Sequence, residues 1–319
     1  MAIDSKNQHA LHQARKSQLE RSSLYIESFQ SALDTTSDYE RACCPTCNYQ
    51  PDHPLFVKNR GEYAYCPECD HVFLLNPLTD QKLIQFYTDY PTSSLEWHQN
   101  ESDFYSRIYQ RGIELFGPHR SGDRLLDIGC SSGYFLSIAA QQGYDAFGIE
   151  PNSQEARYAL MNGINVVGST IDDLSAAKGS FDVITLWDVL EHIRNPVDYL
   201  STLRSLLNKR GLVFVQVPTS DSLAARILRD KCNMFDGIEH LTLFSSRSLD
   251  AAFQNSGFSC LAKKTVISEI HAITNFLGYQ ADPYLGTPSH PLTLDLLSDD
   301  YLENSGLGYK IQSVYQLVP

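Results

Sequence analysis

The sequence has no long hydrophobic run. No apolar segment of the 319-residue chain approaches the roughly 20 residues that a membrane-spanning helix needs. The N-terminal segment, MAIDSKNQHALHQARKSQLERSS, also lacks the apolar core of a secretion signal. These absences predict a protein without a membrane span and with a cytoplasmic location.

Positive charge is scarce as well. Lysine and arginine number 25 against 38 acidic residues, which gives a net charge of -13. Such a charge repels phosphate backbones and counts against a nucleic-acid partner, although a local basic face is compatible with it. Repeats and low-complexity tracts are also missing, and 42% hydrophobic residues are typical of a globular chain.

Six short apolar runs alternate with helical patterns between Gly122 and about Leu261. They read RLLDIG, DAFGIE, INVVG, FDVITLW, GLVFVQVP and SCLAKKTV. Alternating strands and helices predict parallel βαβ units with helices on both faces of one sheet. We therefore expect an α/β, doubly wound fold. The last stretch, from Ile267, shows no clear periodicity.

Two CxxC pairs stand ahead of this region. Cys44 and Cys47 form the first pair, Cys66 and Cys69 form the second, and 18 residues separate the two pairs. Two such pairs supply the four thiolates of a tetrahedral zinc site, which leaves no position for water or substrate. The spacing predicts a structural zinc domain. Cys43 adjoins Cys44, so the sequence leaves open which of these two is the ligand.

A turn of small residues follows the first strand of the α/β region, in LLDIGCSSGYF. A dinucleotide fingerprint needs G-x-G-x-x-G, and the corresponding positions here are Gly129, Ser131 and Tyr134, which disfavours a nicotinamide cofactor. Small residues still allow a ligand close to the backbone. Glu150 ends the next strand, where its carboxylate can accept both hydroxyls of a ribose. Adenosine without a pyrophosphate fits this arrangement.

These motifs resemble the class I S-adenosylmethionine-dependent methyltransferases. The first motif of that family is D/E-x-G-x-G-x-G, and a serine replaces its middle glycine here. The resemblance covers roughly residues 122–261 and implies a Rossmann-like sheet, with Glu150 as the ribose-binding acid and Ile171 and Asp172 near the adenine. The positions that the resemblance assigns to the cofactor are Asp127, Gly129, Cys130, Ser131, Gly133, Glu150, Pro151, Ile171, Asp172, Trp187, Asp188 and, in a covering segment, Tyr90.

Two Glu-His pairs are candidates for the proton transfer that a hydroxyl or carbon acceptor requires. Glu191 and His192 follow the fourth strand, and Glu239 and His240 follow the fifth βα unit. The alternative is a purely structural role, in which His192 packs against or caps a helix and Glu239 is solvated. The segment E-H-x-x-x-F-S resembles the nucleotide-sugar C-methyltransferases, in which that glutamate and histidine have acid/base roles. The chain departs from them at Gly237, where they carry a tyrosine, and in its short C-terminal part.

The sequence predicts five segments: N-terminal helices (1–40), a zinc-binding domain (41–76), a helical linker or lid (77–121), the methyltransferase core (122–262) and a C-terminal extension (263–319). The expected function is methyl transfer, at carbon or oxygen, to a sugar nucleotide, natural product or glycan or lipid intermediate. An RNA methyltransferase and a noncatalytic S-adenosylmethionine-binding scaffold remain alternatives. The acceptor and the oligomeric state are not defined by the sequence.

Overall fold

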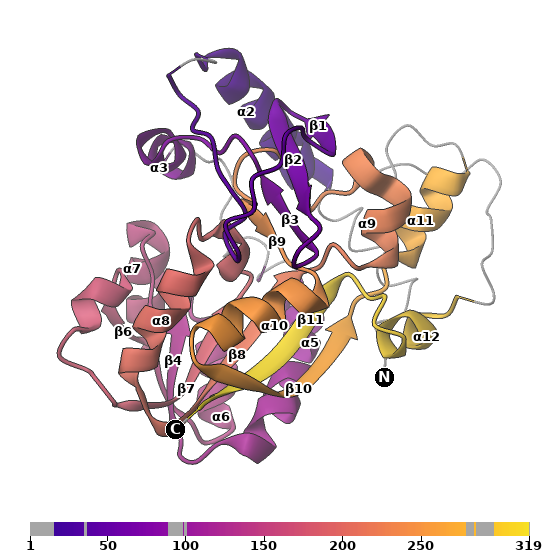
Figure 1. Cartoon of the computed structure of the whole chain (residues 1–319). Helices are drawn as coiled ribbons and strands as arrows, with labels where there is room; N and C mark the ends of the chain where they lie inside the picture. The colour runs from indigo at the N-terminus through magenta and orange to yellow at the C-terminus, as the bar shows by residue number, and fades with distance from the viewer. Residues whose placement is uncertain are drawn as a thin grey trace. The chain divides into compact units, whose positions relative to one another are not determined.

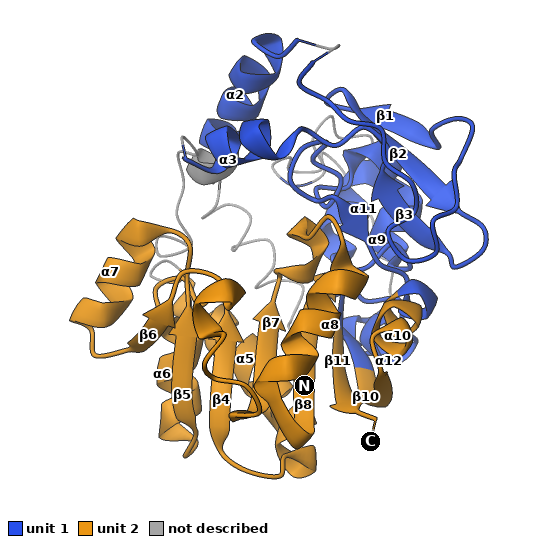
Figure 2. Ribbon diagram, turned by 60° about the vertical axis from the view of Figure 1, so that its left-hand side comes forward, with its two compact units in different colours: residues 1–92, 218–248, 264–311 blue, residues 93–217, 249–263, 312–319 orange. Residues whose placement is uncertain are grey.

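The structure is a computed structural model that describes residues 16–34, 37–88, 98, 101–278, 284 and 297–318. The chain divides into two compact units (Figure 2). Unit 1 contains residues 1–92, 218–248 and 264–311, and unit 2 contains residues 93–217, 249–263 and 312–319. Within the described ranges, no helix has the length and apolar character to cross a bilayer.

A seven-stranded sheet in the order β10-β11-β8-β7-β4-β5-β6 lies mostly in unit 2, and only residues 264–266 and 310–311 of its last two strands along the chain, together with Pro218, are assigned to unit 1 (Figure 1). Its strands are β4 (Arg124–Ile128), β5 (Asp145–Ile149), β6 (Asn165–Gly168), β7 (Phe181–Trp187), β8 (Leu207–Pro218), β10 (Phe258–Val266) and β11 (Lys310–Leu317). The strands from β4 to β8 pair in parallel. All six predicted strands are present, and the α/β, doubly wound fold class is confirmed.

The strand β11 was not predicted. The Tyr309 amide donates to the carbonyl of Ile267, and the Val318 amide donates to the carbonyl of Gly257 at 3.0 Å. The start of β11 therefore lies beside the end of β10, so the two strands are antiparallel. Most of β11 is buried on both faces, so its sequence lacks the polar-apolar alternation that marks a half-exposed strand.

Helices cover both faces of this sheet. In Figure 1, α8 and α10 lie on one face and α5 and α6 on the other. The elements are α5 (Ser102–Phe116), η1 (Gly117–His119), α6 (Tyr134–Gln141), α7 (Ser153–Met161), η2 (Ile171–Leu174), η3 (Leu190–His192), α8 (Pro196–Leu206) and α10 (Ser246–Asn255). Local sequence explains two of the starts: the Asn152 side chain caps α7, and α8 begins with Pro196, whose missing N–H is not needed there.

Unit 1 is built on a small antiparallel sheet in the order β1-β2-β3-β9. Its elements are α2 (Lys16–Ser31), β1 (Phe56–Lys58), β2 (Gly61–Cys66), β3 (His71–Leu74), α3 (Asp80–Thr88), α9 (Leu223–Leu228), η4 (Arg229–Lys231), β9 (Thr242–Leu243), α11 (Ile270–Leu277) and α12 (Asp299–Asn304). Thr242 pairs with Phe73, and Leu243 with Val72. The strand that follows Glu239 and His240 thus completes the sheet of the cysteine-bearing hairpin.

Candidate functional site

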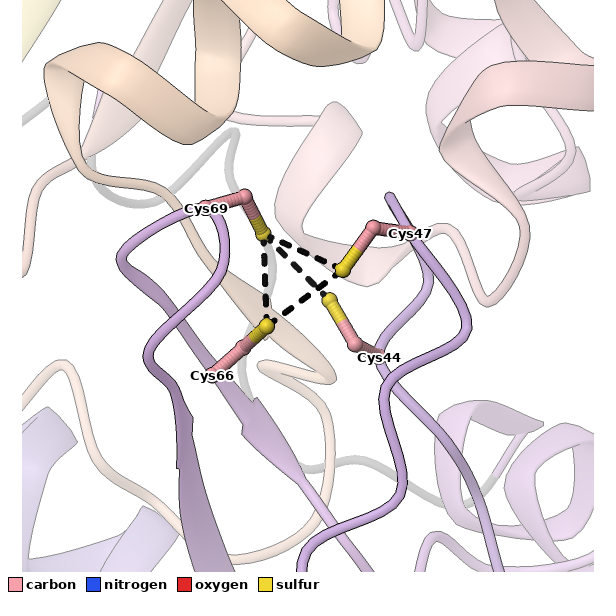
Figure 3. Close-up of side chains that lie close together, drawn as sticks. All are labelled: Cys44, Cys47, Cys66 and Cys69. Atoms are coloured by element: carbon pink, nitrogen blue, oxygen red, sulfur yellow. Dashed lines mark hydrogen bonds between the residues drawn. The ribbon is translucent and has the colours of Figure 1, made fainter.

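The four predicted cysteine ligands converge in unit 1 (Figure 3). The sulfur atom of Cys44 lies 3.5 Å from that of Cys69, and the sulfur of Cys47 lies 3.4 Å from that of Cys66. A tetrahedral zinc with Zn–S bonds of about 2.3 Å requires sulfur-sulfur separations of about 3.8 Å, close to these values. A disulfide would need about 2.05 Å. The cluster therefore fits a tetrahedral metal, and it contains Cys44 and not Cys43.

The backbone of both cysteine pairs has the same form. Asn48 follows Cys47 with φ +62°, and Asp70 follows Cys69 with φ +59°. Asparagine and aspartate tolerate this left-handed conformation better than other residues with a side chain. Burial raises the pKa of the Cys44 thiol to about 12. Several thiolates in such a setting need a cation to compensate their charge.

The turn after β4 has an unusual backbone. Gly129, Ser131 and Gly133 all have positive φ, at +70°, +51° and +79°. A Cβ at Gly129 would lie 2.9 Å from the side chain of Val189, and one at Gly133 would lie 2.6 Å from Ile164. Both positions therefore require glycine on steric as well as conformational grounds. The serine between them holds a conformation that is uncommon outside glycine.

The carboxylate of Glu150 is fixed against this turn. One oxygen accepts the backbone N–H of Ser131 at 2.8 Å, and the other accepts that of Asn152 at 2.7 Å. The residue is only 7% exposed. Burial raises the pKa of Glu150 to about 7, although the two amides act in the opposite direction. Each oxygen keeps further acceptor capacity, as binding a diol requires.

Asp127 is a second buried carboxyl group near the end of β4. Its Oδ1 accepts the hydroxyl of Thr185, on β7, at 2.6 Å. Burial raises the pKa of Asp127 to about 8, the Thr185 hydroxyl lowers it, and the charge of Glu150 raises it again. A positive charge bound beside these two carboxyls would lower both pKa values and favour their charged forms.

The side chains of two other predicted cofactor residues, Cys130 and Trp187, are packed inside the protein. The Cys130 thiol is buried, and a Cβ at Gly148 would lie 2.5 Å from its sulfur. Cys130 also donates its backbone N–H to Ile149. The Trp187 ring packs among aromatic rings, including Phe214 with centroids 4.4 Å apart. The Trp187 Nε1 is buried and has no hydrogen-bond partner among the described residues.

The remaining predicted cofactor residues differ in exposure. Asp188 has φ +55°, and its Oδ2 accepts the Gln216 side-chain amide at 3.0 Å. Pro151 and Asp172 are exposed, whereas Ile171, at the start of η2, is half-buried. Tyr90 lies outside the described residues.

His98, a buried residue beside the turn, was not predicted from the sequence. Its Nδ1 lies 3.2 Å from the Ser132 hydroxyl, and its Nε2 lies 2.9 Å from the Tyr109 hydroxyl. Burial lowers the pKa of His98 to about 4, so its imidazole is neutral at physiological pH. No spacing in the sequence marks it, because its partners are brought to it by the fold from α5 and from the turn.

The segment around the predicted Glu239–His240 pair is a tight loop in unit 1. Asp236 accepts the backbone N–H groups of Ile238 and Glu239 at 2.7 and 2.8 Å. Burial and the charge of Asp236 raise the pKa of Glu239 to about 7. Both Glu239 and His240 are half-buried.

The structure gives a reason for the glycine at position 237, where the sequence resemblance led us to expect a tyrosine. The φ of Gly237 is +83°, and a Cβ there would lie 2.4 Å from the carbonyl oxygen of Lys58. A side chain would therefore displace the loop from the β1–β2 hairpin.

His192 lies in unit 2, at the end of η3, and is half-buried. Glu191, the residue before it, is almost fully buried, with 1% exposure. His192 is therefore held on a short structured turn that follows β7.

Comparison with known proteins places these features in a family. The family model described as "Methyltransferase domain" matches residues 97–263, more than half of the chain. The chain belongs to this family. The matched methyltransferase domain contains the positive-φ turn, Glu150, His98 and His192.

The curated relatives of the methyltransferase domain include O-methyltransferases of ubiquinone biosynthesis. The one from Cereibacter sphaeroides is 38% identical over 98 residues, which cover 29% of this chain and 40% of that protein. The one from Xanthomonas campestris pv. campestris is 24% identical over 150 residues, which cover 39% of this chain and 63% of that protein. The chain thus spans less than two thirds of these relatives.

Among solved structures, an S-adenosylmethionine-dependent methyltransferase from Archaeoglobus fulgidus is 18% identical, with a TM-score of 0.49. The match covers 69% of this chain and 96% of the chain from Archaeoglobus fulgidus.

Proposed function

We propose that the protein transfers a methyl group from S-adenosylmethionine to a small-molecule acceptor. Family membership supports the reaction type, and the relatives named above are O-methyltransferases of ubiquinone biosynthesis. The observation that carries the proposal is the Glu150 carboxylate, held by two backbone amides beside a turn with three positive φ angles. This combination offers a fixed diol acceptor next to backbone that a ligand can approach closely.

The residues around the turn fit this cofactor. The Ser131 hydroxyl is buried and has no hydrogen-bond partner among the described residues, so it can donate to or accept from a ligand. Asp127 and Glu150 lie where burial disfavours their charged forms. A cationic ligand would favour ionisation of both carboxyls. When bound, S-adenosylmethionine supplies an already activated methyl group on its sulfonium.

Glu239 and His240 are the proposed acid/base pair, with His192 as a further candidate. Transfer to a hydroxyl or carbon acid needs removal of a proton, and histidine titrates near neutral pH. Burial and Asp236 raise the pKa of Glu239 into the same range, so this carboxyl can also exchange a proton near pH 7. The remaining task of the protein is to align the acceptor and exclude water.

The cysteine cluster is proposed to hold a structural zinc ion. Four sulfur ligands fill a tetrahedral shell, and the cluster packs against Ala64, Phe73 and Leu75. Zinc would fix the hairpin formed by β2 and β3, which pairs with β9 directly after the Glu239–His240 segment. We assign the zinc no step in the reaction.

The proposed function is tested with protein that has been analysed for metal content. Calorimetric titrations with S-adenosylmethionine and S-adenosylhomocysteine measure cofactor binding, with NAD as a negative control. Methyl-labelled S-adenosylmethionine is then incubated with phenols, sugar nucleotides and transfer RNA, separately. Cofactor binding and label transfer to a small molecule are expected. Binding without transfer to any acceptor, unaltered by replacement of Glu239 and His240, would favour the scaffold alternative. Transfer to RNA alone would contradict the small-molecule proposal.

A further inference from the structure

Asp236 lies at the centre of the loop that contains the proposed acid/base pair. We propose that Asp236 is a positioning residue that fixes the orientation and the tautomer of the His240 imidazole. This inference rests on the proposed function, which gives the orientation its use. The orientation and the tautomer of the ring can be measured independently of that function.

The first observation is the shape of the loop. Oδ1 of Asp236 accepts the backbone N–H groups of Ile238 and Glu239 at 2.7 and 2.8 Å. Oδ2 lies 3.2 Å from the backbone nitrogen of His240, which also donates toward the same carboxylate. One carboxylate therefore accepts hydrogen bonds from three successive backbone N–H groups. These bonds fix the backbone that carries the side chains of Glu239 and His240.

The second observation is the contact with the imidazole. Nδ1 of His240 lies 2.9 Å from Oδ2 of Asp236 and 2.7 Å from the carbonyl oxygen of Met234. A carbonyl and an ionised carboxylate can only accept, so Nδ1 must carry the proton and donate. In the neutral ring Nε2 then carries the lone pair, which makes it the nitrogen that can take up a proton.

Electrostatics support the same assignment. Burial raises the pKa of Asp236, but the charge of a protonated His240, its hydrogen bond and the backbone N–H groups of Ile238 and Glu239 lower it. Asp236 is therefore ionised at neutral pH. A fixed anion beside an imidazole stabilises the imidazolium that forms when the ring accepts a proton.

The β1–β2 hairpin holds Asp236 itself. The Asn59 side chain donates to the carbonyl oxygen of Asp236 at 3.0 Å, and the Gly237 N–H donates to the Tyr63 hydroxyl at 2.8 Å. Lys58 donates to the carbonyl of Cys232 at 2.9 Å. The position of Asp236 thus depends on the hairpin between β1 and β2 and not on the loop alone.

The test is nitrogen NMR of the histidine rings in the full-length, metal-loaded protein at pH 8. Histidine labelled with ¹⁵N in the ring shows which nitrogen carries the proton, and His240→Gln identifies the His240 signals. Asp236→Asn removes the negative charge and presents an N–H group to Nδ1. Asp236→Ser keeps an oxygen that can cap the loop but cannot reach the ring. Asp230→Asn, six residues earlier, where the carboxylate is half exposed and faces Lys231, removes the same charge as a control.

The wild type and Asp230→Asn are expected to show the Nδ1–H form. Asp236→Asn is expected to move the tautomer ratio toward Nε2–H by about tenfold or more, since a hydrogen bond to a charged group is lost. Asp236→Ser is expected to move it less, in the same direction. It provides the same test if Asp236→Asn fails to fold. An Nε2–H wild type, or an unchanged ratio in the folded variants, would overturn the inference.

Kinetics provide the functional part of the test once the label-transfer assay has given an acceptor. Asp236→Asn is expected to lower kcat by about 100-fold or more, with KM for S-adenosylmethionine unchanged. An unchanged kcat would show that the tautomer does not serve the reaction and would overturn the positioning role. Failure of the wild type to bind S-adenosylmethionine would instead refute the proposed function, while the NMR result would stand.

Discussion

Glu150 gives the most direct test of the proposed cofactor site. Its two carboxylate oxygens each accept one backbone N–H, at 2.8 and 2.7 Å, and are proposed to accept the two hydroxyls of a ribose. Glu150→Ala removes both of those acceptors. At about 1.5–3 kcal/mol for each hydrogen bond to a charged group, the loss is about 3–6 kcal/mol. The expected dissociation constant for S-adenosylmethionine rises by about 10²–10⁴-fold.

Glu150→Gln separates charge from shape. The amide keeps one acceptor oxygen, but its NH₂ group faces an N–H that needs an acceptor. We expect a smaller loss, about 10–100-fold in affinity, which corresponds to one charge-assisted hydrogen bond. Glu114→Ala is the matched control, because Glu114 is an exposed glutamate on α5 in the same unit. Its affinity is expected to equal that of the wild type.

The assay is calorimetric titration of each variant, after thermal unfolding has shown that it is folded. S-adenosylmethionine and S-adenosylhomocysteine contain the same ribose, so Glu150→Ala is expected to weaken both by the same factor. A folded Glu150→Ala protein that binds either ligand within about threefold of the wild type would refute the role of Glu150. Loss of affinity for S-adenosylmethionine alone would place Glu150 near the sulfonium and not at the ribose.

Three further predictions follow from the described geometry. Cys44→Ser is expected to lose bound zinc and to lower the melting temperature of unit 1, whereas Cys43→Ser is expected to do neither. Metal analysis and thermal unfolding of both variants test this. Equal effects of the two substitutions would contradict the assignment of Cys44 as the ligand. Gly237→Ala is expected to destabilise the protein by about 1–3 kcal/mol in denaturant unfolding, because its φ is +83° and its Cβ would meet the Lys58 carbonyl. The pKa of Asp127 is about 8 in the folded protein and near 3.8 when unfolded, so the folded state retains a proton that the unfolded state has lost, and stability is expected to fall as pH rises from about 4 to 8. Asp127→Asn is expected to flatten that dependence, and an identical pH profile of unfolding would argue against a raised pKa.

Local sequence patterns were sufficient for much of the fold. The alternation of apolar runs and helical stretches predicted six of the seven strands of the large sheet, because each run is short, buried and bounded by turn residues. The cysteine cluster was predictable for a similar reason: two ligands three positions apart form one knuckle wherever it lies in the chain. The strand β11 was missed because most of its residues are buried on both faces, and its place in the sheet depends on distant strands.

The candidate site shows the same division between local and distant information. Glu150 and the glycines of the turn could be predicted, since a strand end and a turn are local features. His98 could not, because its partners Ser132 and Tyr109 come from separate elements. Nor could Asp236, whose role is visible only from the direction of its carboxylate toward the His240 ring.

The departure at Gly237 illustrates why a mismatch with a similar family can have a structural cause. The β1–β2 hairpin crosses the Asp236 loop so closely that a Cβ at Gly61 would lie 2.5 Å from the Cα of Gly237. Two glycines far apart in the sequence therefore permit one crossing, and neither alone indicates it. At this crossing the buried Tyr63 hydroxyl accepts the Gly237 N–H, so a phenol reaches the loop from the hairpin. The glycine thus belongs to a loop that the β1–β2 hairpin fixes, and a side chain at position 237 would disturb the segment that carries Glu239 and His240.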